Sequence, residues 1–131
     1  MTNRTYNICI PIFNEAENVE KLLEKLNKFL QNSDNKNTFN IVFYDDGSTD
    51  NTVEILKKYK EITLLEGKEN RGLGYAVKNL IDFSIEKNVD GIFKVDGDNQ
   101  MEISEINNFI QYEKFKESDV IYGNRFNSNL S

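Results

Sequence analysis

The sequence alternates between short apolar runs and longer amphipathic segments, and this alternation leaves few folds open to the chain. Five apolar runs, rich in β-branched and aromatic residues, have the length of strands: residues 6–12, 39–44, 62–65, 89–95 and 119–122. Between them, apolar residues recur at steps of three and four, as in Val19, Leu22, Leu23 and Leu26, which is typical of an amphipathic helix. The alternation predicts an α/β fold with a mostly parallel sheet and helices on both faces.

Length and charge favour one acidic domain formed by residues 1–131. A chain of this size can bury a substantial core, and no repeat or linker divides it. Lys and Arg number 16 against 22 Asp and Glu, which gives a formal net charge of −6. Without a basic surface the chain is not expected to bind nucleic acid, so an anionic ligand would have to be held locally, for instance through a cation.

Rare residue types limit the chemistry further. Cys9 is the single cysteine, so no disulfide can form within the chain, and this favours a cytoplasmic location. No apolar run approaches the roughly 20 residues of a spanning helix, so no membrane span is expected in this chain. Histidine is absent, which leaves acid/base or metal chemistry to carboxylates.

Unusual polar clusters follow the predicted strands, nearly all of them directly and one, 70–74, just beyond the third strand. They are residues 14–15, 45–50, 70–74, 96–100 and 123–125. The carboxyl ends of parallel strands meet at one edge of a sheet, and open α/β sheets bind their ligands there. The five clusters are therefore expected to form one site.

Asp96-Gly97-Asp98, after the fourth predicted strand, is the sharpest of these signals. Two carboxylates on one turn, with the amide of Gln100 nearby, are hard oxygen ligands that suit Mg²⁺ or Mn²⁺ bridging a diphosphate. The alternative is that these residues only form a turn and cap the next helix. The apolar strand before them and the other acidic turns favour the metal site.

Asp45 and Asp46 follow the second predicted strand and are interpreted as ligand contacts. Adjacent carboxylates at a sheet edge repel each other, whereas hydrogen bonds to a base or to ribose hydroxyls would give them a function. In the same segment Ser48 or Thr49 is expected to cap the following helix, with Asp50 near the positive end of the helix dipole.

The glycine-containing segment 70–74 and the arginines give weaker signals. The segment lacks the third glycine of a dinucleotide fingerprint. It is either a flexible turn before a helix or a close approach of backbone to a ligand, with Arg71 near the phosphates. Arg125 could pair with a diphosphate or with the acidic turns, and Glu15 either caps the first helix or contacts the ligand.

Together these segments resemble the inverting glycosyltransferases of family 2, which have the Rossmann-like GT-A fold of nucleotide-diphospho-sugar transferases. The matching segments are 10–15 (IPIFNE), 45–50 (DDGSTD), 70–76 (NRGLGYA), 96–100 (DGDNQ) and 123–125 (GNR), in the order and spacing of the family. They cover nearly the whole chain and look most like the dolichyl-phosphate mannose synthase and polyprenyl-phosphate sugar transferase branch.

The resemblance implies roles for individual residues. The nucleotide would be bound by Pro11, Phe13 and Glu15 in the base pocket, Asp45 and Asp46 at the base or ribose, and Arg71, Gly74 and Arg125 toward the phosphates. Asp96, Asp98 and Gln100 would hold Mg²⁺ or Mn²⁺ on the donor diphosphate. Asp96 and Asp98 would be catalytic, because the metal stabilises the leaving nucleoside diphosphate. Phe13 stands where the family usually has Tyr, so a hydroxyl contact is lost while stacking remains.

The resemblance also implies an activity: transfer of a hexosyl group from a UDP- or GDP-sugar to a polyprenyl phosphate or a cell-surface glycan, in cell envelope glycan biosynthesis. Family members continue well beyond Arg125, where the acceptor site and any catalytic base lie. The chain is therefore expected to be the N-terminal, donor-binding part, incomplete for turnover alone. Within a longer protein it would act in the cytoplasm at the inner membrane face, and its unfinished sheet edge favours a homodimer.

Two other classes of function remain as alternatives. One is a noncatalytic module that retains the nucleotide-sugar pocket to bind its ligand or a partner. The other is a phosphoryl-transfer domain of the receiver or haloacid-dehalogenase-like phosphatase type, in which acidic residues also follow a strand. The lysine and second acidic motif that such domains need are not found at the required places.

Overall fold

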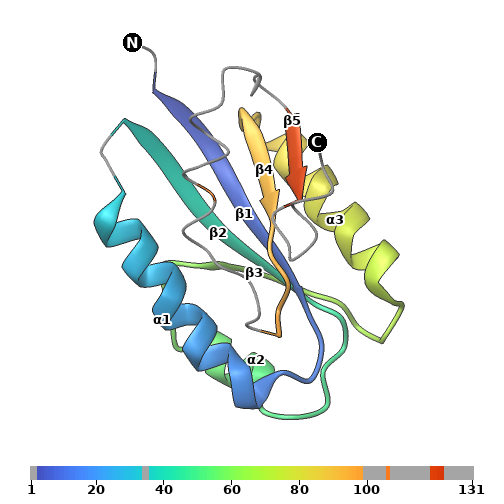
Figure 1. The fold of residues 1–131 in the computed structure, drawn as a ribbon. Helices are drawn as coiled ribbons and strands as arrows, with labels where there is room; N and C mark the ends of the chain where they lie inside the picture. The colour runs from blue at the N-terminus through green and yellow to red at the C-terminus, as the bar shows by residue number, and fades with distance from the viewer. Residues whose placement is uncertain (1–2, 34–35, 99–105, 107–118, 123–131) are drawn as a thin grey trace.

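The five predicted strands form one parallel sheet, which the computed structural model shows over residues 3–33, 36–98, 106 and 119–122 (Figure 1). The elements are, in chain order, β1 (Arg4–Ile12), α1 (Ala16–Asn32), β2 (Asn37–Asp45), α2 (Thr52–Leu56), β3 (Thr63–Glu66), α3 (Leu73–Glu86), β4 (Gly91–Lys94) and β5 (Asp119–Tyr122). The strand order is β3-β2-β1-β4-β5, and every neighbouring pair is parallel. The predicted α/β architecture is confirmed.

The register of the sheet brings the ends of β1, β2 and β3 level, and β4 ends three residues before the end of β1. Ile12 at the end of β1 lies opposite Asp45 at the end of β2, and Asp45 in turn lies opposite Glu66 at the end of β3. On the other side of β1, Cys9 lies opposite Lys94, the last residue of β4. The turns that leave these strands therefore emerge beside one another at the carboxyl edge of the sheet.

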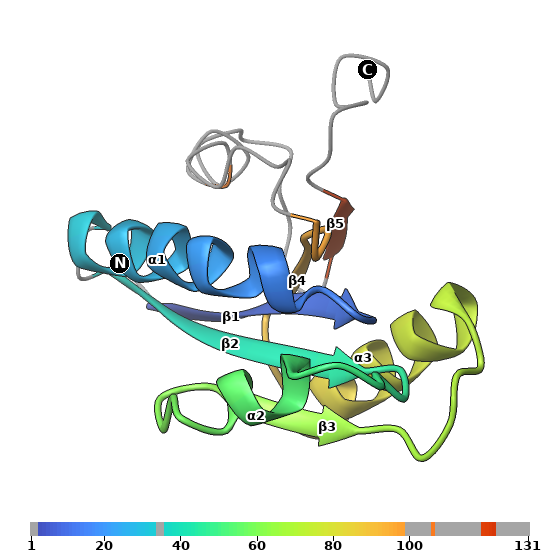
Figure 2. The ribbon, with the colours of Figure 1, turned by 90° about the horizontal axis from the view of Figure 1, so that it is seen from below.

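The helices divide between the two faces of the sheet, as the alternation predicts. Figure 2 shows α1 and α3 on opposite sides of β1 and β2. The larger core lies under α1 and α2, and its fully buried members include Ile8, Ile10, Leu22, Leu26 and Phe43. Burial of each such side chain contributes about 1.5–3 kcal/mol, so this face supplies most of the hydrophobic stabilisation.

The face under α3 has a smaller apolar cluster and a buried polar contact. Asn7 Nδ2 on β1 donates a hydrogen bond to Ser84 Oγ at 2.8 Å, and that hydroxyl donates to the Leu80 carbonyl oxygen at 2.9 Å. Cys9 Sγ lies 3.5 Å from the same hydroxyl, and burial raises the pKa of its thiol to about 11. These bonds join α3 to the middle of the sheet without leaving Asn7 or Ser84 unpaired.

Two helices differ from what the periodicity indicates. Apolar residues at helical spacing run from Val53 to Tyr59, but α2 ends at Leu56 and contains five residues. The same spacing predicts a further helix over residues 103–110; of these only Ile106 lies within the described residues, where it is helical and buried in the larger core. No helix in the described part of the chain is long and apolar enough to cross a membrane.

Candidate functional site

The turn after β2 is joined by side-chain hydrogen bonds to the turn after β1. Asn14 donates its backbone N–H to Ser48 Oγ at 2.8 Å, and its side-chain Oδ1 accepts the backbone N–H of Thr49 at 2.8 Å and of Asp50 at 3.3 Å. Asn14 has a φ of 51°, a left-handed conformation that asparagine tolerates better than most residues. The prediction that Ser48 or Thr49 caps α2 is wrong, because both residues are used to hold Asn14 instead.

Asp50 joins the start of α1 to the start of α2. Its carboxylate accepts the backbone N–H of Ala16, the first residue of α1, at 3.2 Å and that of Thr52, the first residue of α2, at 2.9 Å. Burial raises the pKa of Asp50, but the hydrogen bonds from Thr52 and Ala16 outweigh burial and hold the pKa below its ordinary value. Glu15 donates its backbone N–H to Thr52 Oγ1 at 2.9 Å, and its carboxylate accepts from Asn18 Nδ2.

Asp46 joins the turn after β2 to the loop between β3 and α3. Its two carboxylate oxygens accept the backbone N–H groups of Arg71 and Gly72 at 2.9 and 2.8 Å. Gly47, with a φ of 76°, lies so close to this loop that a Cβ atom there would be 2.6 Å from the carbonyl carbon of Glu69. The carboxylate of Asp46, adjacent to that of Asp45, therefore has a structural role. The sequence alone had indicated a ligand contact for both residues.

Asp45 has one satisfied and one unsatisfied carboxylate oxygen. The side chain is 2% exposed, and Oδ2 accepts the backbone N–H of Ser48 at 3.0 Å. Oδ1 is buried and has no hydrogen-bond partner among the described residues. A buried carboxylate oxygen costs free energy unless a donor reaches it, so this atom is suited to accept a hydrogen bond from a ligand.

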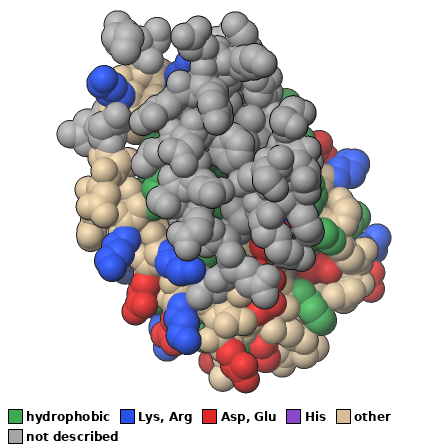
Figure 3. Space-filling view, viewed as in Figure 1, with side chains coloured by type: hydrophobic (Ala, Val, Ile, Leu, Met, Phe, Trp, Pro, Cys, Tyr) green, Lys and Arg blue, Asp and Glu red, His purple; other side chains and the backbone are tan. Residues whose placement is uncertain are grey.

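The acidic turn after β4 lies against the end of β1. A Cβ atom at Gly97 would be 3.0 Å from the Pro11 carbonyl oxygen, so only glycine leaves this contact relaxed. Asp96 and Asp98, on either side of Gly97, are both partly exposed. Phe13, one residue past β1, has 40% of its surface exposed, as a side chain that stacks on a ligand would. Figure 3 shows acidic side chains gathered toward the lower end of this view, the end to which the strand arrows of Figure 1 point.

Lys94 is a charged residue at this edge that the sequence analysis missed. Its Nζ lies 2.7 Å from Asp96 Oδ1, and the lysine and aspartate side chains are 14% and 25% exposed. The available signal was a lysine at the end of an apolar strand, two positions before Asp96. Residues at that spacing on extended backbone share one face of the sheet.

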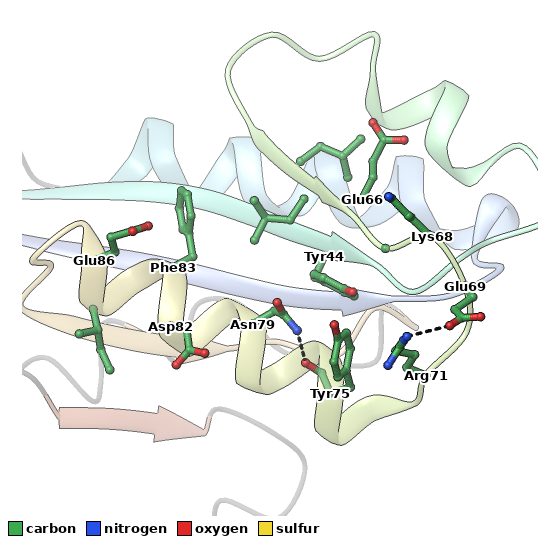
Figure 4. Close-up of a pocket in the computed structure, with 14 residues that line it drawn as sticks. Tyr44, Glu66, Lys68, Glu69, Arg71, Tyr75, Asn79, Asp82, Phe83 and Glu86 are labelled. Carbon is green, nitrogen blue, oxygen red and sulfur yellow. Dashed lines mark hydrogen bonds and ion pairs between the residues drawn. The ribbon is translucent and has the colours of Figure 1, made fainter.

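Arg71, two residues before α3, lines a groove of about 890 Å³ between α3 and β3 (Figure 4), and Gly74 lies in the first turn of α3. The guanidinium group of Arg71 forms an ion pair with Glu69 at 2.9 Å and lies 5.1 Å from the ring centre of Tyr75. A Cβ atom at Gly74 would meet no atom within 4 Å, so the fold itself does not require glycine there.

Two predicted site residues cannot be placed. Gln100, expected to ligate a metal, and Arg125, expected to contact a phosphate, lie outside the described residues. Within the described residues no group of three or more acidic, cysteine or histidine side chains is arranged to hold a metal ion. The carboxylates that the fourth turn presents are those of Asp96 and Asp98.

Solved structures share this fold. The structure of Staphylococcus aureus TarS 1–349 in complex with UDP matches with a TM-score of 0.66 at 23% identity, over 81% of this chain and 32% of that one. The mannosyltransferase PcManGT from Pyrobaculum calidifontis, in complex with GDP-Man and Mn²⁺, matches with a TM-score of 0.53 at 22% identity, over 63% of this chain and 25% of that one. The fold is that of the GT-A transferases, as the resemblance implied.

The sequence comparison then assigns the family. Residues 7–131 match the family described as glycosyl transferase family 2, and the chain therefore belongs to it. A dolichyl-phosphate beta-glucosyltransferase from Dictyostelium discoideum is 35% identical over 81 residues, which is 55% of this chain and 25% of that protein. The uncharacterized protein MJ0544 of Methanocaldococcus jannaschii is 28% identical over 122 residues, 88% of this chain and 50% of that protein. The chain spans a quarter to a half of these relatives.

Proposed function

We propose that this chain binds the nucleoside-diphosphate sugar of a glycosyltransferase at the carboxyl edge of its sheet, together with a divalent cation. The observation that carries the proposal is the packing of the Asp96-Gly97-Asp98 turn on the end of β1, beside three turns that hydrogen bonds hold together. Family membership and the fold both support it. They also weigh against the phosphoryl-transfer alternative, because that class has a different family and fold.

The donor set of the fourth turn fits Mg²⁺ or Mn²⁺. Asp96 and Asp98 offer hard carboxylate oxygens, and both side chains are accessible from solvent. We propose that they hold the cation, with Gln100 as a further ligand. When bound, such a cation stabilises the negative charge on the departing nucleoside diphosphate. On this basis Asp96 and Asp98 are the proposed catalytic residues.

The neighbouring turns would bind the nucleoside. Exposed Phe13 would stack on the base, with Pro11 and Glu15 beside it, and the unpartnered Oδ1 of Asp45 would accept a hydrogen bond from the base or ribose. Asp46 would act mainly by fixing the loop that carries Arg71, since both of its oxygens already bind that loop. Arg71, Gly74 and Arg125 would lie toward the phosphates.

The details of the proposed reaction are those expected for a member of glycosyl transferase family 2. Transfer of a hexosyl group with inversion is proposed, from a UDP- or GDP-sugar to a polyprenyl phosphate or a cell-surface glycan, in cell envelope glycan biosynthesis. Dolichyl-phosphate enzymes among the relatives support a lipid-linked acceptor. We propose that this reaction takes place in the cytoplasm at the inner membrane face, and that the chain forms a homodimer at the open sheet edge.

Thermal melting with UDP, GDP, CDP and dTDP, each with and without Mn²⁺, tests donor binding. Ligand at a hundred times its dissociation constant stabilises a protein by ~2.7 kcal/mol, which should raise the melting temperature by roughly 8–15 °C. We expect such a shift with one nucleoside diphosphate, only with the cation, and its loss in Asp98→Ala.

The matched control is Asp82→Asn, which removes an exposed carboxylate on α3 that is paired with Lys78. It should leave the ligand-induced shift unchanged. Absence of any shift with the four nucleotides would contradict the proposal for this chain. Sugar-nucleotide hydrolysis or transfer that depends on Asp98 would in turn exclude the noncatalytic module.

A further inference from the structure

Lys94 and Asp96 form an ion pair that differs from the other ion pairs of the described residues. The pairs Lys57–Glu66, Arg71–Glu69 and Lys78–Asp82 have side chains that are at least 49% exposed. In the Lys94–Asp96 pair the exposed fractions are 14% and 25%, with 2.7 Å between Nζ and Oδ1. Charges that are shielded from water interact more strongly, so this pair is expected to be stronger than those three exposed pairs.

Stability alone does not explain a lysine at this position. Lys94 ends a strand whose preceding residues, Ile92 and Phe93, are buried in the two cores. Removing an ammonium group from water is costly, and an apolar side chain of similar length generally serves a fold at least as well as a buried ion pair. The ion pair therefore points to a function of the charge at Asp96.

We infer that Lys94 is a built-in counter-ion that makes binding of the divalent cation depend on the nucleoside diphosphate. The inference rests on the proposed function and concerns the same turn. The ammonium of Lys94, 2.7 Å from Asp96 Oδ1, offsets part of the negative charge that Asp96 and Asp98 present to a divalent cation, and so weakens its attraction. A nucleoside diphosphate adds negative phosphate oxygens to the site, and such oxygens are the usual partners of one or two protein carboxylates around Mg²⁺.

The consequence is positive coupling between the two ligands. Each ligand raises the affinity for the other by the same factor, because coupling free energies are reciprocal. A site of this kind binds the cation more weakly before the donor nucleotide is present. Without the lysine charge, the two carboxylates would attract the cation more strongly.

The test is Lys94→Met, with free Mn²⁺ measured by electron paramagnetic resonance in titrations with and without UDP or GDP. For Mn²⁺ alone, we expect binding to the variant to be about tenfold tighter than to the wild type, because one positive charge beside the carboxylates is lost. With the nucleoside diphosphate present, the gain should be smaller. The coupling factor should therefore fall.

Two matched variants separate charge from shape. Lys94→Arg keeps the positive charge and should keep the coupling, while Lys78→Met removes a lysine from an exposed ion pair on α3 and should change neither titration. The wild type gives an independent check if Lys94→Met does not fold. Equal Mn²⁺ affinity with and without the nucleotide in the wild type would overturn the inference.

The outcomes also separate this inference from the proposed function. If the wild type binds no nucleoside diphosphate even with Mn²⁺, both fail. If the wild type shows coupling but Lys94→Met binds Mn²⁺ alone no more tightly, the counter-ion role is wrong and the donor site stands. Tighter binding of Mn²⁺ alone by Lys94→Met, with coupling retained in Lys94→Arg, supports both.

Discussion

The turns after β2 and β4 each carry two aspartates at the same edge of the sheet, but the fold uses the two pairs differently. Asp45 and Asp46 are 2% and 5% exposed and accept backbone N–H groups from their own turn and from the loop before α3. Asp96 and Asp98 are partly exposed, and Asp96 is paired with the ammonium group of Lys94. The first pair is part of the framework of the site, whereas the second is presented to solvent.

The difference shows that residue type and position at the edge do not by themselves assign a function. A carboxylate whose oxygens both accept backbone N–H groups, as those of Asp46 do, stabilises the loop it binds. A carboxylate on a solvent-accessible turn contributes less to folding and remains accessible to a cation. The following predictions test this division, from the largest expected effect to the smallest.

Substitution of Asp46 should give the largest difference in stability between the two aspartate pairs. Asp46→Ala leaves the backbone N–H groups of Arg71 and Gly72 without their acceptor and should lower the free energy of unfolding by about 3 kcal/mol. Asp98→Ala, its counterpart on the fourth turn, should lower it by less, because Asp98 is partly exposed. Urea denaturation followed by circular dichroism measures both. Equal losses in the two variants would remove the distinction.

Gly47→Ala should destabilise the framework next most strongly, by about 2 kcal/mol. The residue has a φ of 76°, and its new methyl group would lie 2.6 Å from the carbonyl carbon of Glu69. The turn after β2 must therefore move away from the loop before α3. A thermal melt close to that of the wild type would show that the two turns are less tightly packed than the structure indicates.

Gly74→Ala is the control for Gly47→Ala, because no backbone strain is expected at Gly74. Gly74 lies in the first turn of α3 with open space around it, so alanine should leave stability unchanged or raise it by about 0.5 kcal/mol. If the backbone here approaches the nucleotide, the metal-dependent shift in melting temperature should shrink in the same variant. An undiminished shift would take Gly74 out of the proposed nucleotide site.

Acid titration should reveal the smallest effect, which belongs to Asp50. Its pKa in the folded state is below the ordinary value, so its ionised form stabilises the fold at pH values above the unfolded-state pKa of about 4. That contribution is lost as the pH falls through the lower, folded-state pKa. The difference in unfolding free energy between the wild type and Asp50→Asn should therefore be present at neutral pH and shrink in acid. A difference that does not vary with pH would contradict the assignment.

The sheet could be predicted from the sequence because its strands are short apolar runs that alternate with amphipathic helices. This alternation is typical of a parallel sheet. The same rule correctly placed the clusters at residues 14–15, 45–50, 70–74 and 96–98 at one edge. It could not predict the partners of Asp46, which lie 25 and 26 positions further along the chain. Nor could it show that Ser48 and Thr49 bind Asn14, because a capping residue and a residue that bonds another turn have the same local sequence.

Lys94 shows a second limit of sequence reasoning. In an apolar strand a lone lysine is usually a solvated end residue, since its stem packs while its ammonium group reaches water. Only the short distance to Asp96 and the low exposure of both side chains reveal a shielded ion pair. The spacing of two positions from Lys94 to Asp96 was visible in the sequence, but the burial of the pair depends on the assembled sheet.

The hydrogen bonds between the turns also determine when during synthesis the edge can form. Asn14 binds Ser48 and Thr49 across 34 and 35 positions, and Asp46 binds Arg71 and Gly72 across 25 and 26. Contacts at such separations require the intervening chain to close into a loop first, and several bonds share the entropy cost of each closure. On a ribosome-bound chain we therefore expect the contacts of Asn14 to become possible once Asp50 has emerged, and those of Asp46 only once Gly72 has emerged.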